Sequence, residues 1–318
     1  MTQIRDADRT HRLDPSSFAG GYFRNAVYRH WDPYEDISDE LLEQDRHRLV
    51  AHELTEPAFD GLRRTLALFG AGEESVTEDL TPLLLVTEDV NKQMFLTSQL
   101  YEEAKHTQFF DRYWRDVIDP VAKERGFEVT APTDQRYFND DYVALFEKTE
   151  QAMDRLLTED SPTNRARAYC HYHLIIESVL AQTGYYGIQS SYSPTGADLQ
   201  DGDPVHLEGL IEGITRIRSD EGRHVGFGMH EVQRLIADSG VDPEIVRSTL
   251  QELLGHVAGA LDYTDSAGER PVDATPLIEY ATEKTTRRIE IITDTDADLP
   301  PVEELVHIEG GRELSTGD

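Results

Sequence analysis

The apolar residues recur along most of the chain at the spacing typical of α-helices. From Asp39 onward they return every three or four positions, as at Leu62, Leu66 and Phe69, and few segments show the alternation of a half-buried strand. This pattern predicts helices near residues 40–90 with a break, 91–118, 138–158, 164–190, 205–239, 243–262 and 274–286. The fold class that follows is all-α.

Proline and glycine divide this helical pattern. Asp242-Pro243, for example, supplies an N-cap followed by proline at the first helical position. Residues 1–17 are polar and are expected to be flexible, and 18–37 are expected to form an ordered but irregular lead-in. The acidic residues 294–318 are expected to be a mobile tail. We therefore predict one domain over residues 18–293.

The charge of the chain is strongly negative. It has 318 residues with 62 acidic and 30 basic side chains, which gives a formal net charge of −32 at pH 7, and only five of the bases are lysines. Binding to nucleic acid is disfavoured because it depends on Lys and Arg, and an anionic membrane surface would repel the chain. The composition favours a halophilic protein, in which concentrated salt screens carboxylate repulsion. An ordinary acidic cytosolic protein is the alternative.

Cysteine content and hydropathy indicate the cellular compartment in which the protein works. Cys170 is the one cysteine, so an intrachain disulfide framework and a cysteine-based metal site are excluded. The first residues have no apolar segment like that of a signal peptide, and no apolar run approaches the ~18 residues of a membrane-spanning helix. We therefore expect a soluble, cytoplasmic protein with no transmembrane segment.

Two Glu-x-x-His motifs carry the most specific chemistry. Glu103 with His106, and Glu221 with His224, lie three positions apart, so each pair shares a helix face and can chelate one metal ion. The abundance of Glu and His predicts about one such motif by chance, and a third, Glu304 with His307, lies in the polar tail. We discount that third motif. Glu103 stands among apolar residues and should point into a bundle core, where a carboxylate needs a metal or a partner.

A dinuclear carboxylate site in a ferritin-like four-helix bundle needs two further single Glu residues. Glu177 interrupts an apolar stretch, and either Glu73 or Glu74 follows another. The alternative for Glu177 is a core ion pair with Arg, and for Glu74 such a pair or a solvated face. His173 lies one turn before Glu177 and could reach the same metal, although a supporting or surface role is favoured.

Asp220 directly precedes Glu221 and is a candidate for a supporting role. Its carboxylate could accept the free ring N–H of a metal-binding histidine and so fix the tautomer of that ring. His106 is the partner that we expect.

Four segments carry a resemblance to a known family. They are GEESVTEDLTP (72–82), QMFLTSQLYEEAKHTQFF (93–110), HYHLIIESVLAQTGYYG (171–187) and SDEGRHVGFG (219–228). They resemble the ligand-binding oxidases, a branch of the ribonucleotide reductase small-subunit-like proteins in the ferritin-like superfamily. The resemblance runs from about Phe18 to Ile292. It implies a ferritin-like four-helix bundle core with additional helices, and a homodimer.

The resemblance also implies a ligand set. Glu73, Glu103 and His106 would hold one ion, and Glu177, Glu221 and His224 the other, with Glu103 bridging the two. It selects Glu73 over Glu74, which spacing leaves open. The implied metals are one manganese, at the first position, and one iron. Carboxylate and imidazole ligands suit a pair of iron ions equally.

Two further family features would fall on named residues. An ether crosslink would join Val76 to Tyr172. Tyr172 lies five residues before Glu177, about 140° round an ideal helix, and a local π-bulge could bring it closer. A long-chain fatty acid would bridge the metals with its carboxylate and fill an apolar channel lined by Leu180, Ala181 and Tyr185. The implied activity is that of a metal-dependent oxidase that activates O2, forms the ether and oxidises a bound hydrocarbon chain.

Two other functions fit the same ligands. One is a radical-generating ribonucleotide reductase small subunit, but Phe110 stands where many such subunits carry a radical Tyr, and the end ELSTGD has no aromatic anchor. The other is a non-enzymatic ferritin-like metal-binding protein. Two features depart from the family: the stretch between Pro82 and Gln93 is short, and His173 is an additional possible ligand.

Overall fold

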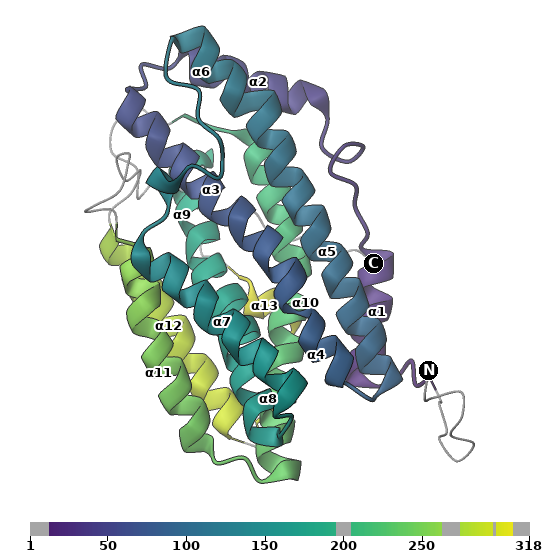
Figure 1. The fold of residues 1–318 in the computed structure, drawn as a ribbon. Coiled ribbons are helices and arrows are strands. Elements are labelled where there is room, and N and C mark those ends of the chain that lie inside the picture. The colour runs from purple at the N-terminus through teal and green to yellow at the C-terminus, as the bar shows by residue number, and fades with distance from the viewer. Residues whose placement is uncertain (1–12, 195–204, 263–273, 295–296, 308–318) are drawn as a thin grey trace.

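The computed structural model describes residues 13–194, 205–262, 274–294 and 297–307, and within these ranges the chain forms helices and no strand (Figure 1). The α-helices are α1 (Phe18–Tyr28), α2 (Asp39–Ala51), α3 (Glu56–Asp79), α4 (Thr81–Val86), α5 (Val90–Tyr113), α6 (Asp119–Arg125), α7 (Asp140–Thr158), α8 (Pro162–Tyr169), α9 (Gln182–Tyr192), α10 (Glu208–Ser239), α11 (Pro243–Ala260), α12 (Ala274–Thr293) and α13 (Val302–Leu305). Two π-helical segments, Trp114–Ile118 and Cys170–Ala181, join α5 to α6 and α8 to α9. The predicted all-α, ferritin-like class is confirmed.

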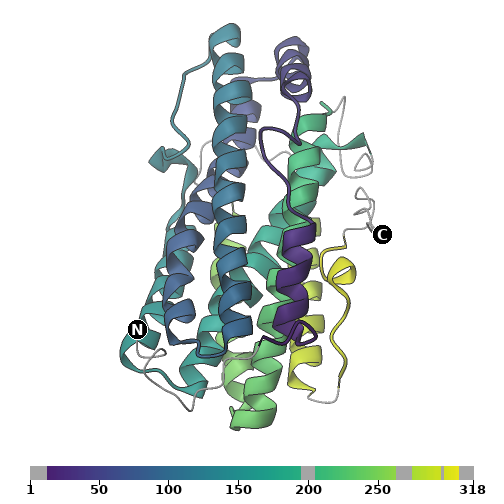
Figure 2. The same ribbon diagram turned by 90° about the vertical axis from the view of Figure 1, so that its right-hand side faces the viewer.

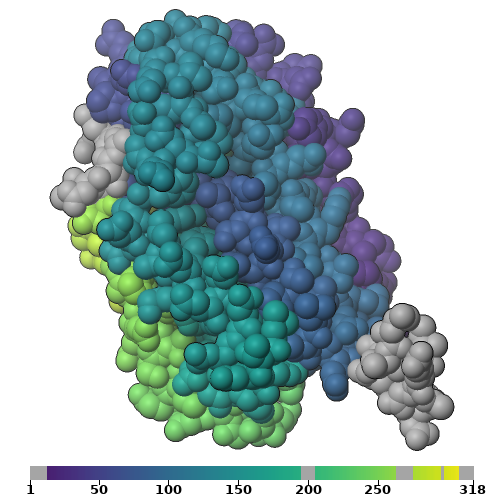
Figure 3. Space-filling view, viewed as in Figure 1, coloured from purple at the N-terminus to yellow at the C-terminus, as the bar shows by residue number. Residues whose placement is uncertain are grey.

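Four long elements build the centre of the molecule: α3, α5, α10 and the continuous helix that runs through α8, the π segment Cys170–Ala181 and α9 (Figures 1 and 2). Helices α7, α11 and α12 pack against the π segment, and α1 packs against α5 and α10. Figure 3 shows the face on which α7 and α8 lie beside α3 and α5. None of the described helices is both long and apolar enough to cross a membrane.

The bundle contains two apolar clusters, and the central helices contribute to both. On α3 the change from one cluster to the other comes between Ala67 and Val76, and on α10 between Ile217 and Val225. Polar side chains can therefore be held between two dry layers, where water is scarce and electrostatic interactions are strong. Glu221 and His224 lie at the junction on α10, and Glu103 and His106 lie at a similar junction on α5, between Leu96 and Phe109.

Helix ends follow ordinary capping chemistry. The side chain of Asp242 accepts a hydrogen bond from the backbone N–H of Glu244, and Pro243 is the first residue of α11, as predicted. Gly126 and Gly240 adopt the left-handed conformation that ends α6 and α10.

The helix that contains Pro120 continues where a break was predicted. The π-helical turn Trp114–Ile118 changes the hydrogen-bond register, and the backbone N–H of Asp119 donates to the carbonyl of Trp114. Pro120 then takes one of the first positions of α6, where an N–H donor is not required. The chain therefore stays helical to Arg125.

The lead-in is more regular than predicted, because residues 18–28 form α1. Gly20 and Gly21 disfavour a helix on propensity alone. The side chain of Ser17 caps the helix, however, by accepting a hydrogen bond from the backbone N–H of Gly20, and Ala19 and Ala26 are buried. Packing against α5 and α10 therefore outweighs the two glycines.

Part of the acidic tail, which was expected to be mobile, is packed against the bundle. Leu305 and Val306 are buried. The carbonyl of Val306 accepts a hydrogen bond from the buried guanidinium of Arg218, and that of Leu305 from Arg288 at 2.9 Å. This docking depends on contacts between distant residues, which a charge pattern does not reveal. Residues 1–12 and 308–318 lie outside the described ranges.

A partly buried ion-pair network links α5 to α10, seven positions beyond His224 on α10. Glu231 is almost fully buried, and its carboxylate lies 2.7 Å from Nζ of Lys92 and 3.0 Å from Arg234. Burial alone would raise the pKa of Glu231, but His230, Lys92 and Arg234 outweigh burial and lower the pKa to about 2. The folded state therefore favours the charged carboxylate.

We expect Glu231 to stabilise the fold in a pH-dependent way. Its folded pKa of about 2 lies below the unfolded value near 4.5. Its contribution, about 3 kcal/mol, is therefore present above pH 4.5 and is lost as the pH falls toward 2. Urea denaturation of wild type and Glu231→Gln should differ by a constant free energy from pH 7 to about pH 5.5 and converge below. A difference independent of pH would contradict this assignment.

Candidate metal centre

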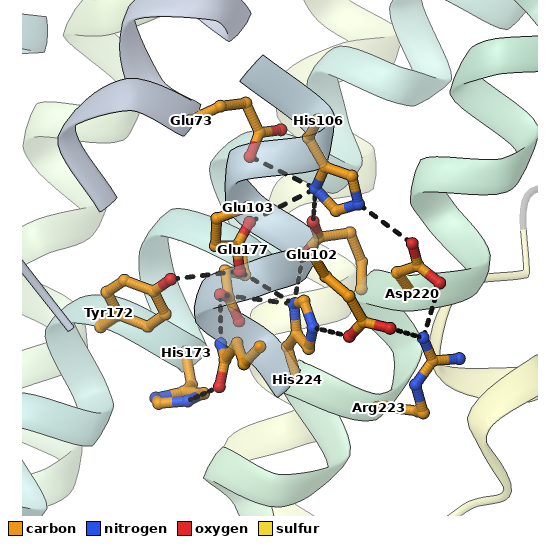
Figure 4. A network of polar contacts seen from close by, with 12 residues as sticks. Glu73, Glu102, Glu103, His106, Tyr172, His173, Glu177, Asp220, Arg223 and His224 are labelled. Atoms are coloured by element: carbon orange, nitrogen blue, oxygen red, sulfur yellow. Dashed lines mark hydrogen bonds and ion pairs between the residues drawn. The ribbon is translucent and has the colours of Figure 1, made fainter. Parts of the chain in front are cut away.

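The structure brings the six predicted metal ligands together in the middle of the bundle (Figure 4). They come from four elements: Glu73 from α3, Glu103 and His106 from α5, Glu177 from the π segment, and Glu221 and His224 from α10. All are buried, and the most accessible, Glu73, is 7% exposed. The two motifs that are 118 positions apart in sequence therefore face one another.

The first of two groups of possible metal ligands consists of His106, Glu73, Glu103 and Glu221. The Nδ1 atom of His106 lies 3.4 Å from Glu73 Oε2, 3.3 Å from Glu103 Oε2 and 3.4 Å from Glu221 Oε1. One ligand atom from each of these four residues falls within 4.8 Å of the others, which is the spacing of a metal-binding group.

His224 stands in the second group. Its Nδ1 atom lies 3.1 Å from Glu103 Oε1, 3.7 Å from Glu177 Oε1 and 3.5 Å from Glu221 Oε2. Glu103 thus presents one oxygen to each histidine, and so does Glu221. The family resemblance implies Glu221 as a ligand of the second ion alone, whereas here its carboxylate faces both histidines.

The Nε2 atom of each histidine, which faces away from the central carboxylates, lies beside a carboxylate on the opposite helix. Nε2 of His106, on α5, lies 3.2 Å from Asp220 Oδ2 on α10, and Nε2 of His224, on α10, lies 2.8 Å from Glu102 Oε2 on α5. Each motif is preceded by an acidic residue whose carboxylate bonds to the histidine of the other motif. Asp220 occupies the expected place beside His106. Glu102 was missed, although an acidic residue directly before each Glu-x-x-His was a visible signal.

This geometry leaves a place for cations. A carboxylate at Nε2 holds the ring proton there, so the lone pair of Nδ1 points at the central carboxylates. In the described structure Nδ1 of His106 and of His224 lacks a hydrogen-bond partner, as does Oε2 of Glu177 and of Glu221. A lone pair on Nδ1 repels the lone pairs of a facing carboxylate oxygen. A metal ion placed between the two atoms would attract both of them.

The net charge of the centre also indicates a site for cations. Among the residues that the structure describes, six carboxylates are buried here, on Glu73, Glu102, Glu103, Glu177, Asp220 and Glu221, beside two buried cations, on Lys105 and Arg223. With both imidazoles neutral, the net charge is −4, which two divalent ions would neutralise. Carboxylate and imidazole ligands suit manganese and iron. The residues present therefore fit a pair of such ions.

Protons take part of this charge when metal is not bound. Burial raises the pKa of Glu73 to about 8 and that of Glu177 well above its usual range. Burial would lower the pKa of His106, but the carboxylate of Glu73 and hydrogen bonds to Asp220, Glu103 and Glu221 raise it well above the usual value. Metal binding must displace these protons, so metal affinity should increase with pH.

A polar shell holds the supporting carboxylates. Asp220 accepts a hydrogen bond from the indole N–H of Trp31 at 2.8 Å and lies 2.8 Å from Nζ of Lys105. The guanidinium of Arg223 donates to Asp220 at 2.6 Å and also to Glu102. The lead-in segment thus reaches the centre through Trp31, and Arg223 connects the two carboxylates that support the histidines.

His173 belongs to neither ligand group. Its Nε2 atom lies 3.3 Å from Oε1 of Gln99, whose amide nitrogen donates to Glu177 Oε1 at 2.8 Å. A side chain at Gly228 of α10 would place its Cβ 2.2 Å from Cβ of His173, so the glycine allows α10 to approach here. His173 therefore contacts a neighbour of Glu177 and does not face the two histidines.

Tyr172 approaches the centre because the helix around it is π-helical. The segment Cys170–Ala181 winds with wider turns than an α-helix, and the hydroxyl of Tyr172 donates to Glu103 Oε1 at 3.3 Å. Burial raises the pKa of Tyr172 well above its ordinary value, so the side chain is a neutral phenol. Val76 is buried on α3, and both residues belong to the same apolar cluster.

An apolar cavity adjoins the central carboxylates. Its lining includes Glu73, Glu103, Glu177 and Glu221 together with Val76 and the three predicted channel residues, Leu180, Ala181 and Tyr185. The hydroxyl of Tyr185 lacks a partner in the described structure, and its ring stacks on Phe69 at 4.8 Å. The lining is thus largely apolar, apart from this group of carboxylates.

The other candidates lie outside the centre. Glu74 is exposed, whereas Glu73 is buried in the first group. Glu304 pairs with Arg287, and neither Glu304 nor His307 belongs to a metal-binding group among the described residues. Cys170 is buried with a free thiol.

Replacing Asp220 with Asn should weaken metal binding about 10–100-fold, because the histidine would lose the acceptor that orients it. Metal affinity is measured by competition with a chelator. The matched control is Glu231→Gln, which removes another buried, ion-paired carboxylate from α10 but leaves the centre intact. Equal losses in both variants would show a general effect of charge and would refute the role of Asp220.

Solved structures with a similar fold are known. No protein-family model matches the chain. An R2-like ligand-binding oxidase with an aerobically reconstituted Mn/Fe cofactor superposes with a TM-score of 0.75 and is 27% identical, covering 89% of this chain and 96% of that chain. A variant of an R2-like ligand-binding oxidase with an anaerobically reconstituted Mn/Fe cofactor gives a TM-score of 0.73 at 27% identity, over 87% and 94%. In fold and over most of its length, the chain is therefore similar to the R2-like ligand-binding oxidases.

Proposed function

We propose that the protein is a metal-dependent oxidase that activates O2 at a dinuclear Mn/Fe site. The observation that carries this proposal is the pair of ligand groups that share Glu103, with both Nδ1 lone pairs directed at buried carboxylates. The Mn/Fe cofactor of the similar solved structures supports the choice of metals.

In this proposal the six central side chains hold the metals. Glu73, Glu103 and His106 would hold manganese, and Glu177, Glu221 and His224 would hold iron, with Glu103 shared by the two groups. Asp220 and Glu102 keep the ring protons on the outer nitrogens, so that Nδ1 of each histidine is free to bind. When bound in reduced form, the ions would supply two of the four electrons that O2 requires, and Val76 and Tyr172 would supply the other two.

The protein residues prepare this oxidation. The phenol of Tyr172 must lose its proton as the C–O bond to Val76 forms, and Glu103 is the carboxylate to which that proton is already hydrogen-bonded. The apolar cluster that contains both side chains excludes water from the bond being formed. Two hydrogens are removed in total, one from the phenol and one from the valine side chain.

The cavity suits an amphiphile such as a long-chain fatty acid. Its carboxylate would bridge the metal ions, and its hydrocarbon chain would lie along Leu180, Ala181 and Tyr185. Apolar walls with a few polar groups at one end are typical of a site that orients a ligand of this kind. A hydrocarbon held beside the metals is also a candidate substrate for oxidation.

Mass spectrometry tests the proposal. Protein loaded anaerobically with manganese and iron and then exposed to air should lose two hydrogens, and its digest should contain a joined peptide with Val76 and Tyr172. Metal-free protein and a Tyr172→Phe variant should show neither change. Absence of the crosslink in protein with both metals bound would overturn the proposal in favour of a radical-generating subunit or a metal-storage protein.

Assembly as a homodimer and residence in the cytoplasm belong to the same proposal. Light scattering on the metal-loaded protein would give the mass of the assembly. A monomer mass near 36 kDa at all concentrations would contradict the dimer.

A further inference from the structure

A second recess is lined by residues of α7, α8, the π segment and α11. The three α-helices pack against one another, as Figure 1 shows. The recess shares no lining residue with the cavity beside the central carboxylates. Its volume of about 360 Å³ is far larger than the roughly 10–15 Å³ that one water molecule occupies. We refer to this space, lined by Lys148, Arg155, Arg167, His171 and Glu252 with two amide side chains, as the α7–α11 recess.

The charge of the recess is opposite to that of the protein. The chain has twice as many acidic as basic residues and only five lysines, yet three cationic side chains line this one space. Glu252 is the one carboxylate in the lining within the described part of the chain, so these lining residues carry a net charge of +2 with His171 neutral. In a protein of net charge −32, this concentration of positive charge indicates a binding site for an anion.

Two of the cations have no acidic partner. No described carboxylate lies within 4.0 Å of the guanidinium of Arg155 or Arg167, and Arg167 donates to Oδ1 of Asn164 at 3.3 Å. The neighbouring Arg165 shows the usual arrangement, because its guanidinium is paired with Asp160 at 2.6 Å. Two unpaired arginines on the wall of one recess leave N–H donors free for an anion.

His171, in the π segment, also lines the recess. Its Nδ1 atom is buried and lacks a hydrogen-bond partner in the described structure. Burial lowers its pKa to about 4, with Glu252 opposing and Lys148 and Arg167 reinforcing that shift, so the ring is neutral at pH 7. A neutral imidazole, together with the amides of Gln151 and Asn164, can bond to a ligand without changing the charge balance.

We propose that the α7–α11 recess binds a phosphate group, either as inorganic phosphate or as the phosphate monoester of a small molecule. The net charge of +2 matches the charge of about −2 that a phosphate monoester carries at neutral pH. Guanidinium groups bind tetrahedral oxyanions through paired N–H donors. A nucleic-acid strand is a poor candidate, because the rest of this protein would repel a polyanion. The proposal is independent of the oxidase function.

Calorimetric titration with inorganic phosphate and with glycerol 3-phosphate, at pH 7.5 and constant ionic strength, tests this site. Saturable binding with one molecule per chain is expected. Tighter binding of glycerol 3-phosphate would support a monoester as the ligand, and equal binding would support the phosphate group alone. Failure of both compounds to bind would overturn the proposal.

Variants separate a built site from a general effect of charge. Arg155→Gln and Arg167→Gln should each weaken binding about tenfold, because each removes a charge-assisted hydrogen bond. Arg24→Gln is the matched control, since Arg24 is an exposed arginine of α1 that contacts Tyr28, and binding should be unchanged. Equal weakening in all three variants would refute the site.

A substitution with the opposite expected effect guards against misfolded variants. Glu252 lies 2.8 Å from Lys148 and neutralises it. Glu252→Gln should free the lysine and tighten phosphate binding about threefold. Unchanged or weaker binding in this variant, with a native circular dichroism spectrum, would also overturn the proposal.

Discussion

Replacing Glu103 with Ala should abolish binding of both metal ions. Its two oxygens face the two histidines separately, at 3.3 Å from His106 and 3.1 Å from His224, so it belongs to both ligand groups. Without it the first group keeps three ligands and the second keeps only Glu177 and His224 in the same arrangement. Metal content after gel filtration should fall from two ions per chain to none.

Neighbouring carboxylates provide the controls for this experiment. Glu73→Ala should affect the first ion more than the second, and Glu177→Ala the second more than the first, because each lies in one group. Glu74→Ala removes an exposed carboxylate beside Glu73 and should leave the metal content unchanged. Retention of stoichiometric metal by the Glu103 variant, with an unchanged circular dichroism spectrum, would refute the shared role of this residue.

Concentrated salt should stabilise the protein strongly. A net charge of −32 repels itself in the folded state, and the screening length falls from about 10 Å at 0.1 M to about 3 Å at 1 M. We expect the melting temperature to rise by about 10 °C or more between low and molar KCl, which corresponds to several kcal/mol at roughly 2–4 °C per kcal/mol. Thermal denaturation followed by circular dichroism measures this rise.

The salt experiment needs a control for effects other than screening. KCl and NaCl at equal ionic strength should give similar curves if screening is the cause, and an uncharged osmolyte should give a much smaller rise. The melting temperatures of metal-free and metal-loaded protein should rise by similar amounts with salt. Most of the acidic residues lie outside the metal centre, and the carboxylates of the centre are buried. A melting temperature independent of KCl would refute the halophilic interpretation.

The sequence predicted the fold class and the paired motifs because both depend on local spacing. Helical periodicity identified most of the helices, and the i, i+3 spacing placed Glu103 with His106 and Glu221 with His224 on common faces. Spacing alone could not choose between Glu73 and Glu74. The two positions differ by one step of helix rotation, and burial, which separates them in the structure, depends on what packs against α3.

Other features depend on contacts that no local pattern encodes. Helical spacing left open whether a π-bulge brings Tyr172 toward the centre. The structure has the π-helical segment Cys170–Ala181 there, and Tyr172 donates a hydrogen bond to Glu103. The docking of residues 302–307 depends on Arg218 and Arg288, which precede it by many positions and bind backbone carbonyls. Sequence patterns give little information on such pairings.

The two hydrogen bonds that join each histidine to a carboxylate on the opposite helix have a mechanical consequence. His106 and Glu102 lie on α5, and their partners Asp220 and His224 lie on α10. Sliding one helix past the other would break both hydrogen bonds at once, so we expect the two motifs to open together. The central turns of α5 and α10 should therefore unfold as one cooperative unit, and their backbone amides should exchange with solvent at a common, slow rate.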